Sequence, residues 1–165
     1  MKILLLIRHA KSDWADGSLS DFDRSLNERG KKDAPEMASR LLEKKIIPGL
    51  LIASPAKRAK KTALKFAEVL GTPEEEVQFA PELYLAPGET FYKLIEQAEN
   101  KYSTIAVFAH NPGITDFANL LTDTRIDNIP TCGIFGVRVK TDTWGDFEKA
   151  EKEFLFFDSP KAGKE

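Results

Sequence analysis

Short apolar runs alternate along the chain with segments whose apolar residues recur at the spacing of a helix. Residues 3–7, 50–53 and 105–109 are continuously apolar, which is typical of strands buried on both faces of a parallel sheet. Between these runs, residues 34–42 and 59–70 repeat apolar side chains at helical spacing, which predicts amphipathic helices. The alternation predicts an α/β fold with helices on both faces of a mostly parallel sheet.

The rest of the chain supplies a short strand, two further helices and a hairpin. Residues 77–79 form a weak candidate strand, and residues 91–98 and 114–121 show helical spacing again. From there the pattern becomes extended. Residues 134–140 and 147–157 flank a Thr-Trp-Gly-Asp segment, which favours an antiparallel hairpin at the sheet edge.

These elements predict one domain. Residues 1–157 contain no internal repeat, low-complexity tract or linker, so we expect a single three-layer α/β/α sandwich, mostly parallel with an antiparallel edge. Residues 158–165 combine Ser, Pro, Gly and Lys, which predicts a flexible tail.

Composition narrows the possible partners and compartments. The chain has 42% hydrophobic residues, a net charge of −2 and a pI of about 5.8. It therefore lacks the net positive charge that would attract nucleic acid or an anionic membrane. No stretch approaches the roughly 18 apolar residues of a membrane span. The single Cys132 cannot form an internal disulfide, so we expect it to be buried in a cytoplasmic protein. We expect a monomer or weak oligomer.

Polar or charged side chains follow three of the predicted strands directly. Arg8-His9 follows the first, Ser54-Pro55-x-x-Arg58 the second, and His110 the third; the chain has no other histidine. The carboxyl ends of parallel strands line one crevice, so we expect these side chains to meet. The alternative is that they are solvated strand ends.

Helix starts are predicted after two of these strands. Ser54 and Asn111 each precede a proline, a pattern that predicts a capping side chain followed by Pro at the first helical position. Arg58 would then lie near the positive end of a helix, which is unfavourable unless an anion binds there.

An arginine pair with two histidines suits a phosphoryl group. Each guanidinium donates two parallel hydrogen bonds and keeps its charge, while nearby cations favour the neutral, nucleophilic form of histidine. Ser12 and Asn111 are further candidate donors to the phosphate, and the loop of residues 11–23 is long enough to cover the site.

Other chemistries lack their motifs. The sequence contains no HExxH, no cysteine cluster, no GxxxxGK[ST] and no GxGxxG, so we expect no metal and no cofactor. Cys132 also lacks the CxxxxxR loop of cysteine phosphatases.

Three segments match a known family in order. Arg8-His9-Ala10 resembles the RHG/RHA signature of the histidine phosphatase superfamily, which has the phosphoglycerate-mutase-like fold. Ser54-Pro55-x-x-Arg58-Ala59-x-x-Thr62-Ala63 resembles its second motif, and Ala109-His110-Asn111-Pro112 its third. Two lesser segments also match, namely Arg24-x-Leu26-x-x-x-Gly30 and Pro81-Glu82-Leu83-Tyr84. The short chain and its Leu-Tyr-Leu-Ala segment are similar to the compact phosphohistidine phosphatases of the SixA type.

The resemblance implies a role for each matching residue. His9 would take the phosphoryl group, while Arg8, Arg58 and His110 would form the phosphate pocket. Family members use a carboxylate after the third strand along the chain as general acid. The third predicted strand here is residues 77–79, so Glu82 is the positional candidate. An equally open reading is that Glu82 is an ordinary exposed loop residue, and Asp13, Asp16 and Asp21 are further candidates for the general acid.

The predicted function is a phosphatase that works through a covalent phosphohistidine. Little chain between Thr62 and His110 is left for a capping insertion, and an open pocket suits a phosphohistidine on another protein. The alternatives are a phosphatase of small phosphate esters, a mutase, or a non-catalytic phosphate-binding module. The expected partner is thus a phosphorylated protein or a small phosphorylated substrate.

Overall fold

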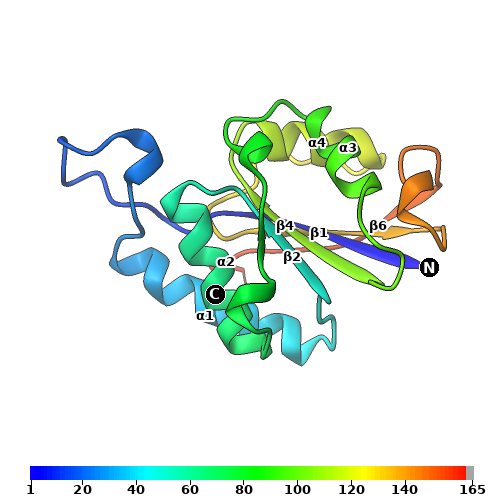
Figure 1. Ribbon diagram of the computed structural model, residues 1–165, viewed down its shortest axis with the longest axis horizontal. Coiled ribbons are helices and arrows are strands. Elements are labelled where there is room, and N and C mark those ends of the chain that lie inside the picture. The colour runs from blue at the N-terminus through cyan, green and yellow to red at the C-terminus, as the bar shows by residue number, and fades with distance from the viewer. Residues whose placement is uncertain (163–165) are drawn as a thin grey trace.

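In the computed structural model, which describes residues 1–162, six strands cross the centre of the molecule with helices on either side (Figure 1). The sheet order is β3-β2-β4-β1-β5-β6. The strands are β1 (Lys2–Arg8), β2 (Leu50–Ala53), β3 (Gln78–Phe79), β4 (Thr104–Ala109), β5 (Ile134–Val139) and β6 (Lys152–Asp158). Strands β1 to β4 pair in parallel, while β5 pairs antiparallel with β1 on one side and with β6 on the other. This confirms the predicted sheet.

Four α-helices complete the two outer layers. They are α1 (Glu28–Glu43), α2 (Lys57–Leu70), α3 (Thr90–Glu96) and α4 (Gly113–Leu121). Short 3-10 turns are η1 (Asp21–Asp23), η2 (Glu74–Glu76), η3 (Pro81–Leu83) and η4 (Trp144–Asp146). Figure 1 shows α1 and α2 on one face of the sheet and α3 and α4 on the other. Within residues 1–162, no helix is both long and apolar enough to span a bilayer.

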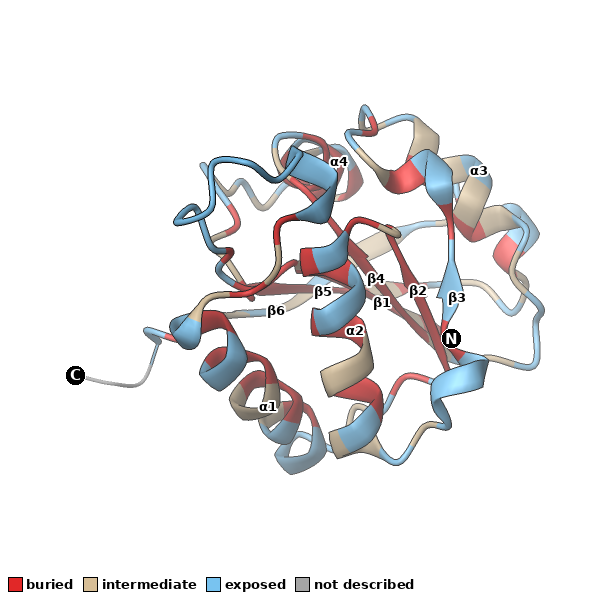
Figure 2. Cartoon of the chain, turned by 60° about the vertical axis from the view of Figure 1, so that its left-hand side comes forward, coloured by how far each residue is buried: buried red, intermediate tan, exposed pale blue. Residues whose placement is uncertain are grey.

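Successive residues of β1 enter two different cores. Leu4 and Leu6 pack with the α3 and α4 side, whereas Leu5 and Ile7 pack with the α1 and α2 side. All four side chains are fully buried, and Figure 2 shows the central strands in the colour of buried residues. Burial on both faces explains why this strand is continuously apolar instead of alternating.

Two helix ends follow the predicted chemistry. The Asn27 side chain accepts a hydrogen bond from the Gly30 N–H at 2.9 Å and caps α1. Gly71 closes α2 in the left-handed region at φ 81°, a conformation that costs glycine little.

The predicted caps at Ser54 and Asn111 are wrong. Helix α2 begins at Lys57 after Ala56, and α4 begins at Gly113; neither start has a side-chain cap. Both predicted capping oxygens are engaged elsewhere: the Ser54 hydroxyl lies 2.7 Å from His110 Nε2, and Asn111 Oδ1 accepts a hydrogen bond from the Thr115 hydroxyl at 2.6 Å.

The C-terminal segment also differs from the prediction. Strand β6 begins at Lys152 and not at residue 147, because Trp144 and Phe147 are fully buried in the core. The segment expected to be a flexible tail begins with the last residue of β6. Arg40 Nη1 donates to Asp158 Oδ1 at 3.0 Å and to the Ser159 carbonyl at 2.7 Å. The ordered domain therefore extends beyond residue 157; residues 163–165 lie outside the described residues.

Candidate active site

The parallel strands bring the two histidines together. In the sheet register Arg8 lies beside Ala109, so His9 and His110 follow neighbouring strand ends. Their ring centroids are 5.1 Å apart. Both rings, with Arg8 and Arg58, line one cavity of about 530 Å³ at the carboxyl edge of the sheet.

His9 is held as a neutral ring with a defined tautomer. Its Nδ1 lies 2.7 Å from the Ala10 carbonyl oxygen, so Nδ1 carries the proton and Nε2 keeps its lone pair. Burial, with smaller contributions from the charges of His110, Arg58 and Arg8, lowers the pKa of His9 to about 3. A neutral imidazole with a free Nε2 is a competent nucleophile at physiological pH.

A buried hydroxyl joins the end of β1 to α2. The Ala10 N–H donates to Thr62 Oγ1 at 3.0 Å, and the Thr62 hydroxyl donates to the Arg58 carbonyl at 2.7 Å. Thr62 is fully buried. This link fixes the peptide that orients His9 relative to the helix turn that carries Arg58.

His110 presents an unpartnered ring nitrogen. The Ser54 hydroxyl oxygen accepts the Ala56 N–H at 3.3 Å and lies 2.7 Å from His110 Nε2, to which the hydroxyl can donate its proton. His110 Nδ1 is then the protonated nitrogen. Burial, then the charge of Arg58, lowers the pKa of His110 to about 4.

Four buried nitrogen atoms at this cavity have no hydrogen-bond partner within the described residues. They are Arg8 Nε, Arg24 Nε, Arg58 Nε and His110 Nδ1, and all four side chains line the cavity. Each unmade hydrogen bond costs about 1–3 kcal/mol. An oxyanion would satisfy such a set of donors.

Asp21 is the carboxylate of this site. Its Oδ2 accepts hydrogen bonds from Arg58 Nη2 at 3.0 Å and from the Tyr84 hydroxyl at 2.6 Å, and its Oδ1 accepts one from Arg24 Nη2 at 2.9 Å. The Tyr84 hydroxyl and Arg24 hold the pKa of Asp21 far below its usual range. Asp21 is therefore ionised at neutral pH and offers no proton.

Comparisons with known proteins decide the family. The profile of the Histidine phosphatase superfamily (branch 1) matches residues 4–84. This chain belongs to the histidine phosphatase superfamily. An uncharacterized chloroplastic protein of Arabidopsis thaliana is 33% identical over 150 residues, which cover 86% of this chain and 68% of that protein.

Solved structures show that the fold is that of phosphoglycerate-mutase-like histidine phosphatases. The protein histidine phosphatase SixA complexed with tungstate superposes with a TM-score of 0.81 at 20% identity, covering 96% of this chain and 97% of that one. A mycobacterial glucosyl-3-phosphoglycerate phosphatase in complex with VO3 has a TM-score of 0.67 at 16% identity, covering 96% and 100%. Membership of this family supports a phosphatase.

This histidine phosphatase does not bring Glu82 to the cavity. Glu82 is exposed in η3 and lines a separate hollow with Glu89 and Lys93. The turn buries Leu83 and directs the next residue, Tyr84, to the cavity instead. The positional assignment of Glu82 as general acid therefore does not fit this structure.

The two further candidate phosphate donors, Ser12 and Asn111, line the cavity with their side chains already engaged. The Ser12 hydroxyl accepts a hydrogen bond from Arg24 Nη1 at 2.5 Å. Asn111 donates to the Ile129 carbonyl at 3.1 Å, and Arg8 Nη1 donates to the same oxygen at 3.1 Å. Both residues thus brace the wall of the histidine phosphatase site.

Sequence reasoning did not assign Arg24 or Tyr84 to the site, and it considered Asp21 only as a further candidate for the general acid. Arg24 is buried and its guanidinium lies 3.4 Å from the centroid of the Trp14 ring. A signal was present, because Arg24 and Tyr84 both fall in the lesser matching segments. No pattern predicted that Asp21 accepts hydrogen bonds from Arg24, Arg58 and Tyr84, because Arg58 and Tyr84 lie far from it in the chain. In the part of the chain that the structure describes, no group of three acidic, His or Cys side chains could hold a metal ion.

Proposed function

We propose that this phosphatase hydrolyses phosphohistidine on a protein and that the phosphoryl group passes through His9. The observation that carries the proposal is the hydrogen bond from His9 Nδ1–H to the Ala10 carbonyl at 2.7 Å. It leaves Nε2 unprotonated inside a cavity lined by three arginines and a second histidine.

The reaction has two displacements at phosphorus. In the first, the His9 Nε2 lone pair forms a bond to phosphorus while the bond to the substrate imidazole breaks. The departing imidazole keeps the electron pair of the broken bond. In the second, water forms a bond to phosphorus, the bond to Nε2 breaks, and inorganic phosphate and a proton are released. Arg8, Arg58 and His110 donate to the phosphoryl oxygens and stabilise their charge in both transition states.

The leaving group distinguishes phosphohistidine from a phosphate ester. An alkoxide needs a proton from a general acid, but among the described residues Asp21 is the only carboxylate that lines the cavity, and it is ionised. A phosphohistidine ring can carry its own proton and leave as neutral imidazole. The cavity lining therefore favours phosphohistidine.

The rim of the cavity supports a protein substrate. Trp14 and Leu85 line the cavity and are 75% and 64% exposed, so two large apolar side chains lie exposed at its mouth. Exposed apolar surface of this kind marks contact sites for other proteins. A mutase must keep its intermediate from water, which an open rim does not favour.

We place this activity in the cytoplasm. Cys132 is free and fully buried, and burial raises the pKa of its thiol. A chain that needs no disulfide is suited to a reducing compartment.

The test is a side-by-side assay on a phosphohistidine protein, a phosphohistidine peptide and simple phosphate esters. We expect the phosphohistidine protein to give the highest kcat/KM. Rapid quenching with labelled substrate should trap an acid-labile phosphoryl group on the wild type and none on His9→Ala. Faster turnover of esters would overturn the substrate class, and turnover by His9→Ala would overturn the role of His9. Phosphate binding without turnover of any substrate would leave the non-catalytic binding module as the function.

A further inference from the structure

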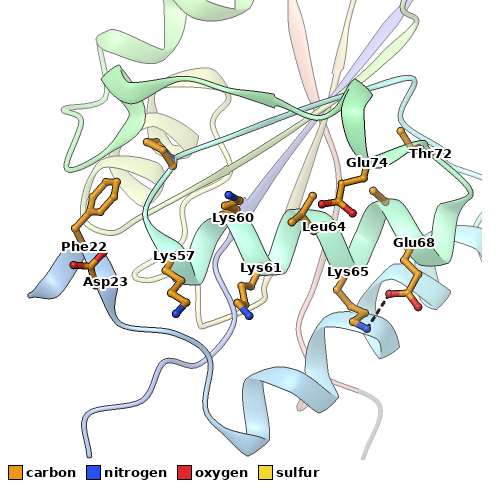
Figure 3. A pocket seen from close by; sticks show the side chains of 12 residues that line it. Phe22, Asp23, Lys57, Lys60, Lys61, Leu64, Lys65, Glu68, Thr72 and Glu74 are labelled. Carbon is orange, nitrogen blue, oxygen red and sulfur yellow. Dashed lines mark hydrogen bonds and ion pairs between the residues drawn. The ribbon is translucent and has the colours of Figure 1, made fainter. Parts of the chain in front are cut away.

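A second, larger hollow adjoins the candidate active site. It is a groove of about 750 Å³ that follows α2 from η1 to η2. Four lysines of α2 line it with Phe22 and Asp23 of η1; the lysines are Lys57, Lys60, Lys61 and Lys65. Figure 3 shows Lys57, Lys61 and Lys65 in a row along the helix, with Phe22 and Asp23 facing the Lys57 end.

The charge of α2 conflicts with its own helix dipole. Its 14 residues include five basic residues and one acidic residue, although the whole chain has a net charge of −2. Its first turn holds no acidic residue, and cations there face the positive end of the dipole. Lys57, Lys61 and Lys65 also repel each other at i, i+4 spacing. An anionic partner would relieve both penalties.

Two of the lysines are available to such a partner. Lys57 and Lys61 are exposed, and the ammonium group of neither has a hydrogen bond or an ion pair within residues 1–162. Lys65, by contrast, binds Glu68 Oε2 at 2.9 Å, and Lys60 lies 5.5 Å from the Phe79 ring centroid.

The groove and the active-site cavity share a wall. Phe22 lines the groove, while its neighbour Asp21 and its ring partner Tyr84 line the cavity. The Phe22 and Tyr84 rings meet edge to face with centroids 5.0 Å apart. On α2, Lys57 lines the groove and the next residue, Arg58, lines the cavity. The groove therefore lies next to the cavity, with η1 and the start of α2 between them.

We propose that the groove docks an acidic segment of the protein whose phosphohistidine enters the active site. This inference rests on the proposed function. The spacing of the lysines sets the length of the segment. Lys57 and Lys65 are eight residues apart on a helix, about 12 Å, which an extended strand covers with about four residues. Phe22 and Leu64 in the lining offer apolar contact to the carbon atoms of that segment.

The experiment uses two synthetic phosphohistidine peptides that are identical except that the Glu residues flanking the phosphohistidine in one are Gln in the other. Hydrolysis of each is measured with wild type, with the double variant Lys57→Gln/Lys61→Gln, and with Lys31→Gln/Lys32→Gln. The last pair makes the same charge change at exposed positions of α1, outside the groove. Phosphoramidate serves as a small substrate that cannot reach the groove.

For wild type, we expect the acidic peptide to be hydrolysed with a kcat/KM about tenfold above that of the neutral peptide, mainly through KM. Lys57→Gln/Lys61→Gln should abolish this preference and leave phosphoramidate turnover unchanged. The α1 variant should keep the preference. Equal kcat/KM for the two peptides with wild type, or equal loss in both variants, would overturn the docking proposal.

A binding measurement separates this inference from the proposed function. Fluorescence anisotropy follows the labelled, unphosphorylated acidic peptide with the same three proteins and needs no turnover. If neither phosphohistidine peptide is hydrolysed but simple esters are, the proposed substrate class fails. Loss of peptide binding in Lys57→Gln/Lys61→Gln alone would still support an acid-binding groove. Unchanged binding, or tighter binding of single-stranded DNA or of anionic vesicles than of the peptide, would overturn it.

Discussion

The surroundings of the two histidines penalise a positive charge on either ring. Both are almost completely buried, and three arginines line the same cavity. The carboxylate of Asp21 offsets part of this charge, because it accepts hydrogen bonds from Arg58 and Arg24. The phosphoryl site is therefore a cationic pocket with one internal counter-ion, and the chemistry of single residues can be tested there.

The pH dependence of folding should follow the histidines. Their pKa values are lowered in the folded protein to about 3 and about 4, below the roughly 6.5 of an unfolded chain. Between pH 4 and 6.5 the unfolded state binds more protons, so stability should fall as pH falls, by up to about 1.4 kcal/mol per pH unit for each histidine. Urea denaturation across this range measures the slope. NMR titration of either ring with a midpoint near 6.5 would contradict the assignment.

Arg58 is the second residue with a direct test. Arg58→Ala should cost about 2–4 kcal/mol of transition-state stabilisation, the range for losing one oxyanion donor. Arg58→Lys keeps the charge without the planar fork and should recover only part of kcat/KM. A rate for Arg58→Ala within a few-fold of wild type would reject its contact with the phosphoryl group.

At the scale of elements, parallel strands explain what the sequence could predict and what it could not. Continuous apolar runs identify buried strands, and parallel pairing then places Arg8 and His110 at one edge. The direction of a side chain in a short turn depends on contacts distant in sequence, which is why Glu82 was assigned to the site while Tyr84 occupies it. Ser54 fits a helix-capping pattern in the sequence, yet its hydroxyl forms a hydrogen bond with His110 Nε2 instead.

The loop beside the site depends on one close approach between elements. A Cβ on Gly30 at the start of α1 would lie 2.2 Å from the Lys11 carbonyl oxygen, so Gly30→Ala must displace backbone next to Ser12. We expect kcat/KM to fall about tenfold or more, because small displacements of catalytic groups are costly. Gly17→Ala is the matched control in the same loop, since a Cβ there meets nothing within 4 Å. Equal activity of the two variants would show that this approach does not position the site.

At the scale of the whole molecule, the two faces of the sheet bury separate cores, and the antiparallel edge closes the fold. The end of β6 lies against α1 through Arg40, which binds Asp158 and the Ser159 carbonyl. Composition alone assigned this segment to a tail. A polar C-terminal stretch looks flexible in sequence because its anchor, Arg40, lies on a distant helix.

The anchor should contribute to stability and not to catalysis. Arg40 and Asp158 are 19% and 14% exposed, and Arg40→Ala should lower the free energy of unfolding by about 1.5–3 kcal/mol, as for hydrogen bonds to charged groups. Arg138→Ala breaks a comparable pair with Glu153, but these side chains are 40% and 44% exposed, so it should cost about 1 kcal/mol or less. Urea denaturation of both variants tests the difference, and equal losses would contradict it.

The placement of the two tryptophans has an optical consequence. Trp144 is fully buried in the core, whereas Trp14 is 75% exposed and stacks on the Arg24 guanidinium beside the phosphoryl cavity. We therefore expect two components in the intrinsic fluorescence. The exposed Trp14 should emit at longer wavelength and respond to oxyanion binding, whereas the buried Trp144 should emit at shorter wavelength and change only on unfolding. In Trp14→Phe, titration with vanadate should leave the remaining emission constant, while denaturation still shifts it.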